Sequence, residues 1–396
     1  MFDLFPLEGG LANVKGFFCD GVSVGLKAND GKDVGFIRSS TPCDVVASFT
    51  TNRFQAAPLK HFQRYEEGFQ TNFLLINSKN ANAMTGEQGI RDIDAIFEKL
   101  RTYRQDLLNP IMSSTGVIGY RLKQDKITSA FDKFDFNATN SDATAQAIMT
   151  TDSFKKEICI QVTPEGSTPF HIAAICKGAG MINPAMATML CFIATDAVLP
   201  KEDAKSLLKN AVQSSFNAVS VDGDTSTNDS VILLSNGQSG VYHKEGFEEA
   251  LNLITMHLAL ELVRDGEGSQ KVVAFEVNGA ASDDEAQIAA KALSNSLLMK
   301  TAIHGEDPNW GRIASTIGSS GITCKEETLR IHYDDVLVYD DDHRELDKET
   351  EEKAFKVMQQ SSYRIICDLG VGEGSFTAYG CDLGHDYVTI NAHYRT

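Results

Sequence analysis

Short runs of apolar and β-branched residues, bounded by glycine and asparagine, recur along the whole 396-residue chain. They cover residues 73–76, 159–163, 172–175, 189–194, 231–235, 272–277, 329–333 and 387–390. Between them, residues 200–212 and 247–264 show the apolar spacing of helices. Ser282 to Glu285 is a capping-box candidate that would open a further helix with its apolar stripe at Ile288, Ala289, Ala292, Leu293 and Leu297. This alternation predicts a mixed α/β or α+β fold, and the length predicts two domains or lobes.

The composition excludes several classes of protein. Hydrophobic residues make up 42% of the chain and charged residues 23%, as in soluble globular proteins. The net charge of −18 argues against nucleic acid as a partner, because phosphate binding needs clustered lysine and arginine. The amino terminus lacks a basic segment followed by an apolar stretch, and no run is long enough to span a bilayer. We therefore expect a cytoplasmic protein that binds neither nucleic acid nor a membrane.

The residues that usually bind metals are scattered. The eight cysteines include no Cys-x-x-Cys pair, and the nine histidines include no His-x-His or His-Glu-x-x-His spacing. We expect reduced, partly buried thiols, no metal site and no bound cofactor. The acidic residues 334–352 have no regular spacing of oxygen ligands, so they predict a solvated hairpin and the start of a helix.

Residues 177–190 form a glycine-rich run that ends in an apolar strand and contains Ala187 and Thr188. A hydroxyl that follows a constrained loop of small residues could attack the preceding carbonyl, here that of Ala187. Cleavage would leave an α-amine on Thr188, with a pKa of about 7.7–8.0, as a base beside the hydroxyl. From the pattern alone, a glycine-rich turn before a buried strand is the commoner explanation, and no phosphate-binding loop motif is present.

Other motifs indicate chemistry less strongly. Thr115 and Gly116 follow a strand-like stretch, where a hydroxyl and a backbone N–H could face a developing oxyanion, although such a sequence is more often an ordinary turn. Lys177 could pair with a carboxylate and Glu267 with an amino group, the two charges of an amino acid. Each of these charges alone would usually lie on the surface.

Two further motifs are interpreted as structural. Asp222, Asp224 and Asp229 form an acidic cluster, which we interpret as a structural loop. Residues 21–25 match the Gly-x-Ser-x-Gly nucleophile elbow, but a turn at 29–32 follows instead of a helix. Ser23 is therefore predicted to lie beside a hairpin and not to act as a nucleophile.

A series of blocks, in order, resembles the ornithine acetyltransferase (glutamate N-acetyltransferase) family, in which the chain breaks before a threonine. Besides residues 177–190, the blocks are residues 77–86, 113–119, 149–152, 220–229, 265–268, 307–312 and 387–396. The resemblance covers nearly the whole chain. Its departures, at Lys79, Met84, Tyr379 and Gly384, fall on none of the residues to which we assign chemistry.

The resemblance implies a complete scheme. The chain would cleave itself between Ala187 and Thr188 into intertwined chains 1–187 and 188–396, two pairs of which form an α2β2 heterotetramer. Thr188 would carry an acetyl group from N-acetylornithine to glutamate in a ping-pong reaction. The fold would be layered, with sheets between helices, as in the self-cleaving aminopeptidases. The residues implied are Thr115 and Gly116 for the oxyanion hole, and Thr151, Lys177, Thr188, Glu267, Asn391 and the terminal Thr396 for the substrate.

Three questions stay open at this stage. Acetyl-CoA could be a second acetyl donor, which would make the enzyme bifunctional. The same self-cleaving scaffold could instead serve an amidase or peptidase that uses water as the acceptor. A non-catalytic protein that binds a small molecule or nucleotide would also use glycine-rich turns to shape a pocket.

Overall fold

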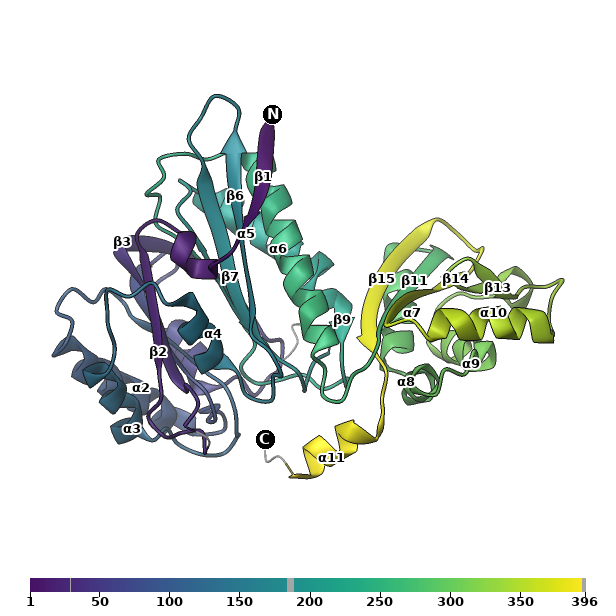
Figure 1. The fold of residues 1–396 in the computed structure, drawn as a ribbon, viewed down its shortest axis with the longest axis horizontal. Coiled ribbons are helices and arrows are strands. Elements are labelled where there is room, and N and C mark those ends of the chain that lie inside the picture. Colours follow the sequence, from purple (N-terminus) through teal and green to yellow (C-terminus); the bar gives the residue numbers. More distant parts are fainter. Residues whose placement is uncertain (29, 184–188, 394–396) are drawn as a thin grey trace.

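The computed structural model describes residues 1–28, 30–183 and 189–393, which form two lobes (Figure 1). The larger lobe contains a nine-stranded sheet with the order β1-β6-β7-β8-β10-β3-β4-β5, in which β2 pairs with β3. Its strands are β1 (Phe2–Leu7), β2 (Phe17–Val22), β3 (Val34–Phe49), β4 (Gln70–Asn77), β5 (Ile111–Ser114), β6 (Lys156–Pro164), β7 (Phe170–Lys177), β8 (Leu190–Thr195) and β10 (Ser230–Ser235). The central strand β8 is buried along its whole length, which explains its continuous apolar sequence.

Helices cover both faces of this sheet. α5 and α6 pack against β3, β6 and β10, and their apolar residues form one core with β6, β7, β8 and β10. α4 packs against β2, β3 and β7, and α2 and α3 share a core with β3 and β4. The helices are α1 (Ala57–Phe62), α2 (Gly86–Arg101), α3 (Gln124–Ser129), α4 (Ser141–Ile148), α5 (Lys201–Ser214) and α6 (Lys244–Arg264), with short 3-10 turns at Gly10–Asn13, Ala130–Asp132 and Phe216–Ala218. The predicted layering of sheet and helices is confirmed.

The smaller lobe contains a six-stranded sheet with the order β13-β12-β14-β11-β15-β9. Its strands are β9 (Val219–Ser220), β11 (Val272–Ala280), β12 (Arg330–Tyr333), β13 (Val336–Tyr339), β14 (Ser362–Asp368) and β15 (Gly374–Cys381). Its helices are α7 (Asp283–Asn295), α8 (Leu297–His304), α9 (Trp310–Ser319) and α10 (Lys348–Met358), with a 3-10 turn at Glu326–Thr328. The acidic residues 334–352 form the turn and second strand of the β12–β13 hairpin, a loop and the start of α10, as predicted.

Most of the predicted elements are confirmed, and the errors are informative. Ser282 caps α7 by accepting the Glu285 N–H at 3.3 Å, but Ile288 is exposed and Leu297 belongs to α8. Residues 387–390, predicted as a strand, lie in the helix α11 (His385–His393). Periodicity cannot distinguish a strand from a helix in so short an apolar run.

The chain on either side of residues 184–188 belongs to the same sheet. β7 pairs with β8 in antiparallel register, so that Lys177 lies opposite Leu190. β10 then pairs with both β8 and β3. α11 follows the smaller lobe and returns beneath the larger one (Figure 1). Segments far apart in the sequence therefore meet at one end of the large sheet.

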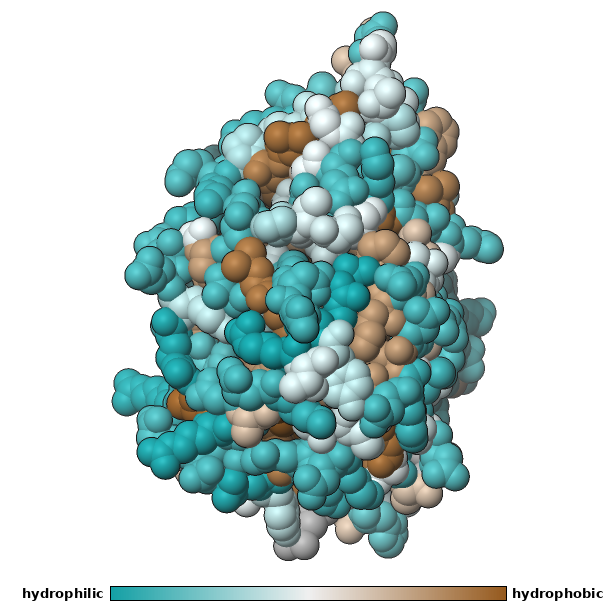
Figure 2. Space-filling model, turned by 90° about the vertical axis from the view of Figure 1, so that its left-hand side faces the viewer, coloured by the Kyte–Doolittle hydropathy of each residue, from teal (hydrophilic) through white to brown (hydrophobic). Residues whose placement is uncertain are grey.

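Figure 2 shows the hydropathy of one face of the molecule. Hydrophilic residues cover most of the face in Figure 2, and hydrophobic residues lie there in small separate groups. Within the part of the chain that the structure describes, no helix is both long and apolar enough to cross a bilayer.

Candidate active site

A small cavity of about 130 Å³ brings together six of the predicted site residues. It is lined by Thr115, Gly116, Thr151, Lys177, Glu267 and Asn391. Ala187, Thr188 and Thr396, the other predicted site residues, lie outside the described residues. Because the six residues come from distant segments, their convergence makes this cavity the candidate active site.

The turn that follows β5 has a backbone that only glycine fits. Thr115 N–H donates to Asn77 O at 3.0 Å, which continues the contact between β5 and β4. Gly116 has a φ of +126°, and a Cβ there would lie 2.3 Å from the backbone carbon of Lys79. The close approach of two backbone segments therefore requires a glycine at this position.

Buried amide side chains hold this turn in place. Asn77 Nδ2 donates to Asn80 O at 2.9 Å, and its Oδ1 accepts the Ser114 hydroxyl at 2.7 Å. Asn228 Nδ2 donates to Ala81 O at 2.7 Å and to Ser114 O at 2.8 Å. Buried polar groups that are fully bonded fix a single geometry, so the backbone around Thr115 is preorganised.

Lys177 ends β7 and is only 3% exposed. Beside it, Gly178 N–H donates to Asp152 Oδ1 at 2.7 Å. Burial by itself would raise the pKa of Asp152, but the positive charges of Lys177 and Lys156 outweigh it and lower that pKa to about 2. Asp152 is thus a carboxylate at neutral pH, with two ammonium groups near it.

A buried ion triad supports the cavity from behind. Lys156 Nζ lies 2.9 Å from Asp152 Oδ1 and 2.5 Å from Asp265 Oδ2, and all three side chains are at most 1% exposed. The two carboxylates raise the pKa of Lys156 although burial opposes them. Asp152 follows Thr151, and Asp265 lies two residues before Glu267. The triad therefore fixes the spacing between two segments that line the cavity, one at Thr151 and one at Glu267.

Glu267 and Asn391 also line the cavity. Asn391 Nδ2 donates to Glu267 Oε2 at 2.7 Å, which joins α11 to the loop after α6. Glu267 is 8% exposed, and a Cβ on Gly180 would lie 2.5 Å from its carboxylate. α11 also places Tyr387 in the cavity, one helical turn before Asn391. The helix thus brings two side chains, four residues apart in the sequence, into the same cavity.

Several other residues that line the cavity were not predicted as site residues from the sequence. They are Thr150, Asp222, Asp224, Ser226, Thr227, Asn228 and Tyr387. All of them fall within the blocks 149–152, 220–229 and 387–396. The blocks were therefore the only available signal. Asp222 and Asp229, interpreted as part of a structural loop, bind backbone N–H groups on either side of residues 184–188.

Two other candidate sites can be assessed. Ser23 follows β2, and the next element is β3, so the strand, turn and helix of a nucleophile elbow are not formed there. Among the residues that the structure describes, no three histidine, cysteine, aspartate or glutamate side chains gather as a possible metal site.

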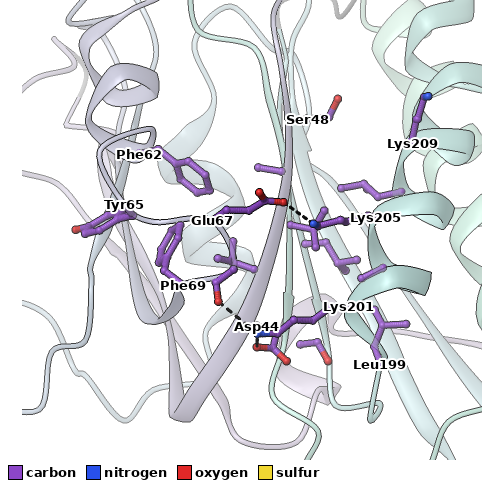
Figure 3. Close-up of a pocket in the computed structure, with 18 of the residues that line it drawn as sticks. Asp44, Ser48, Phe62, Tyr65, Glu67, Phe69, Leu199, Lys201, Lys205 and Lys209 are labelled. Atoms are coloured by element: carbon purple, nitrogen blue, oxygen red, sulfur yellow. Dashed lines mark hydrogen bonds and ion pairs between the residues drawn. The ribbon is translucent and has the colours of Figure 1, made fainter.

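A larger cavity of about 580 Å³ lies elsewhere on the large sheet, between β3, α5 and residues 62–69 (Figure 3). Phe62 and Phe69 form one of its walls, and lysines of α5 form the opposite one. The Glu67–Lys205 ion pair, at 2.6 Å, joins the two sides, and the Asp44–Lys201 ion pair, at 3.3 Å, joins β3 to α5. None of the six predicted site residues that the structure describes lines this cavity.

The smaller cavity joins a buried lysine, a buried glutamate and a Thr-Gly turn in one lining. Two opposite charges in one cavity suit a small ligand that carries both charges. Fold and site together define a protein whose cavity suits small, charged molecules.

Comparison with known proteins identifies the family. The sequence model of the ArgJ family matches residues 18–396. A protein of Wolinella succinogenes is 57% identical over the full length of both chains, and one of Dehalococcoides mccartyi is 40% identical over 100% of this chain and 99% of its own. Both are named arginine biosynthesis bifunctional protein ArgJ. The chain belongs to the ArgJ family and is an acetyltransferase of arginine biosynthesis, as the resemblance implied.

Two solved structures are similar over about half of the chain. ArgJ from Bacillus halodurans is 38% identical, with a TM-score of 0.48 over 51% of this chain and 98% of its own. Ornithine acetyltransferase from Mycobacterium tuberculosis, solved with ornithine, is 27% identical, with a TM-score of 0.41 over 48% of this chain and 100% of its own.

Proposed function

We propose that the enzyme transfers the acetyl group of N-acetylornithine to glutamate through an acetyl ester on Thr188. The chain first cleaves itself between Ala187 and Thr188, which frees the α-amine that acts as the base. Thr188 then attacks the acetyl carbonyl, ornithine leaves, and glutamate takes the acetyl group from the ester. Thr115 and Gly116 stabilise the oxyanion of both tetrahedral intermediates.

One observation carries this proposal: the cavity joins Lys177, Glu267 and the Thr115–Gly116 turn. Lys177 is suited to the substrate α-carboxylate. Glu267, held by Asn391, is suited to a substrate amino group. Thr151 and the terminal Thr396 complete the proposed set of substrate residues.

The register of the large sheet supports continued association of the two chains after cleavage. β3 and β7 belong to chain 1–187, whereas β8 and β10 belong to chain 188–396. β7 pairs with β8 over Ile172–Lys177, and β3 pairs with β10 over Asp44–Phe49. We propose that two such pairs form an α2β2 heterotetramer. Light scattering tests this assembly, since the mass of one pair alone would contradict it.

Acetyl-CoA is proposed as a second acetyl donor. The two relatives described above are named bifunctional, which supports a second activity. No tightly bound cofactor is proposed, and the enzyme is expected in the cytoplasm. Formation of N-acetylglutamate from acetyl-CoA and glutamate, without N-acetylornithine, tests the second donor. Absence of that product would restrict the enzyme to acetyl recycling.

Trapping the intermediate tests the main proposal. With N-acetylornithine alone, we expect an acetyl adduct on Thr188 of chain 188–396, detected by mass spectrometry. With both substrates present, we expect parallel initial-velocity patterns when glutamate is varied. The Thr188→Ala variant should remain one full-length chain on a denaturing gel. Intersecting patterns without an adduct would contradict the proposal, and acetyl release that does not need glutamate would favour the amidase instead.

A further inference from the structure

Two aspartates bind the backbone on the two sides of residues 184–188. On the amino-terminal side, Asp222 Oδ2 accepts the Met181 N–H at 2.6 Å and its Oδ1 accepts the Ile182 N–H at 2.9 Å. On the carboxyl-terminal side, Asp229 Oδ1 accepts the Met189 N–H at 3.0 Å. Both aspartates come from the loop between β9 and β10. One short loop therefore holds both ends of the segment that contains the proposed scissile bond.

The contacts at Asp222 are reinforced by the backbone around it. Ile182 O accepts the N–H groups of Val221 at 2.8 Å and Asp222 at 3.3 Å, and Asn183 Nδ2 donates to Gly223 O at 2.6 Å. Met181 has a φ of +58°, a backbone conformation that residues other than glycine rarely adopt. The bonds to Asp222 offset the cost of that conformation and fix the direction of the chain.

The contact at Asp229 is deeper and involves only one of its carboxylate oxygens. The residue is fully buried, and its own carbonyl accepts the Thr50 N–H at 3.0 Å. Among the described residues, Oδ2 has no hydrogen-bond partner. Burial raises the pKa of Asp229 well above its usual range, although the Met189 N–H, the charge of Lys177 and the hydroxyls of Ser226 and Thr50 lower it. The nitrogen that Oδ1 binds is the nitrogen of the Thr188–Met189 peptide bond.

We propose that Asp222 and Asp229 are positioning residues that hold both flanks of residues 184–188, so that Thr188 can cleave the chain and later transfer the acetyl group. The inference rests on the proposed function of Thr188. Nucleophilic attack requires reacting atoms about 3–3.5 Å apart, and a displacement of about 1 Å can cost about 100-fold in rate. Two anchors at fixed backbone atoms supply that precision.

The two isosteric variants should differ, because the two carboxylates are used differently. Asp229→Asn keeps one carbonyl oxygen for the one N–H that it binds, so cleavage and kcat should stay within about threefold of the wild type. Asp222→Asn keeps one acceptor oxygen for the N–H groups of Met181, Ile182 and Asp224, so cleavage should slow about tenfold or more. The loss of full-length chain on a denaturing gel during incubation measures both rates. A wild-type rate of cleavage in Asp222→Asn would overturn the proposal.

Asp229→Ala removes the Met189 contact altogether. We expect cleavage about tenfold slower or more, and in the cleaved fraction a kcat lowered by about the same factor, with KM for N-acetylornithine within about threefold. A general loss of structure would not separate kcat from KM in this way or be reversed by asparagine. Wild-type cleavage and kcat in Asp229→Ala would also overturn the proposal.

Asp196 provides the matched control at the other end of β8. It is 1% exposed, and its carboxylate accepts the His171 N–H at 2.7 Å and the Lys15 N–H at 3.2 Å. Asp196→Ala should lower Tm but leave cleavage unchanged. If the rate of cleavage falls in proportion to Tm in every variant, both aspartates have only a structural role and the proposal is wrong. If the wild type itself stays full-length and inactive, the proposed function fails first, and this inference fails with it.

Discussion

The two cavities of the large lobe differ in size and in the chemistry of their walls. The cavity in Figure 3 measures about 580 Å³, and the candidate active site about 130 Å³. The charges of the large cavity are exposed and form pairs across it, as in Glu67–Lys205, with side chains 84% and 48% exposed. In the active site, Lys177 and Glu267 are buried, at 3% and 8% exposed.

We propose from this difference that the protection of polar groups from water, more than volume, marks the site of chemistry. A charge in water interacts weakly with a substrate, whereas a buried charge interacts strongly and must be held by other groups. The triad of Asp152, Lys156 and Asp265 supplies such support behind the active site. The exposed pairs around the large cavity contribute little by comparison. The predictions below test this contrast.

The largest effect is expected from Gly116→Ala. A Cβ at this position would lie 2.3 Å from the Lys79 backbone, so the turn must shift and the proposed oxyanion donors move with it. Loss of an oxyanion donor lowers kcat by about 10²–10³-fold. Steady-state kinetics with N-acetylornithine and glutamate measure the loss.

Gly68→Ala is the matched control at the rim of the large cavity. Gly68 also has a positive φ, of +77°, but a Cβ there would meet nothing nearer than Lys201 Nζ at 3.9 Å. Both variants therefore strain the backbone at a positive φ, but only Gly116→Ala brings a Cβ into collision with neighbouring backbone atoms. Similar kcat values for the two variants would contradict the role of the Gly116 turn.

Lys177→Met should have the next largest effect. A hydrogen bond to a charged group contributes about 1.5–3 kcal/mol, so kcat/KM for N-acetylornithine should fall roughly 10- to 150-fold. The variant also removes a positive charge that lowers the pKa of Asp152. An unchanged kcat/KM would remove Lys177 from the substrate site.

Six of the predicted site residues line one cavity, and all six occur in recognisable local blocks of the sequence. Thr115, Gly116 and Lys177 follow or end strands whose apolar runs are plain, so the elements and the residues at their ends were predictable. The buried triad was not, because Lys156 and Asp265 are 109 positions apart and no local pattern relates them. The strand predicted at residues 387–390, which belong to α11, was wrong for a related reason. The contact of α11 with Glu267 is tertiary, and its short apolar run favours neither a helix nor a strand.

The triad also predicts a dependence of stability on pH. The pKa of Asp152 in the folded protein is about 2, below its ordinary value of 3.8. Its stabilising contribution is therefore complete above about pH 4 and is lost as the pH falls through about 2. Asp152→Asn should be about 3 kcal/mol less stable at pH 7, with a weaker dependence on acid between pH 4 and 2. Thermal unfolding at a series of pH values measures both effects, and an unchanged acid profile would contradict the assignment.

The smallest effect is expected from Lys205→Met, the counterpart of Lys177→Met in the large cavity. Both substitutions remove an ammonium group from a cavity wall, but the Lys205 side chain is 48% exposed and its partner Glu67 is 84% exposed. Water already screens that pair, so kcat and KM for both substrates should stay within about twofold of the wild type. Steady-state kinetics with each substrate varied in turn check this. A tenfold rise in either KM at an unchanged Tm would show that the large cavity takes part in substrate binding, and exposure would then be a poor guide to which cavity is used.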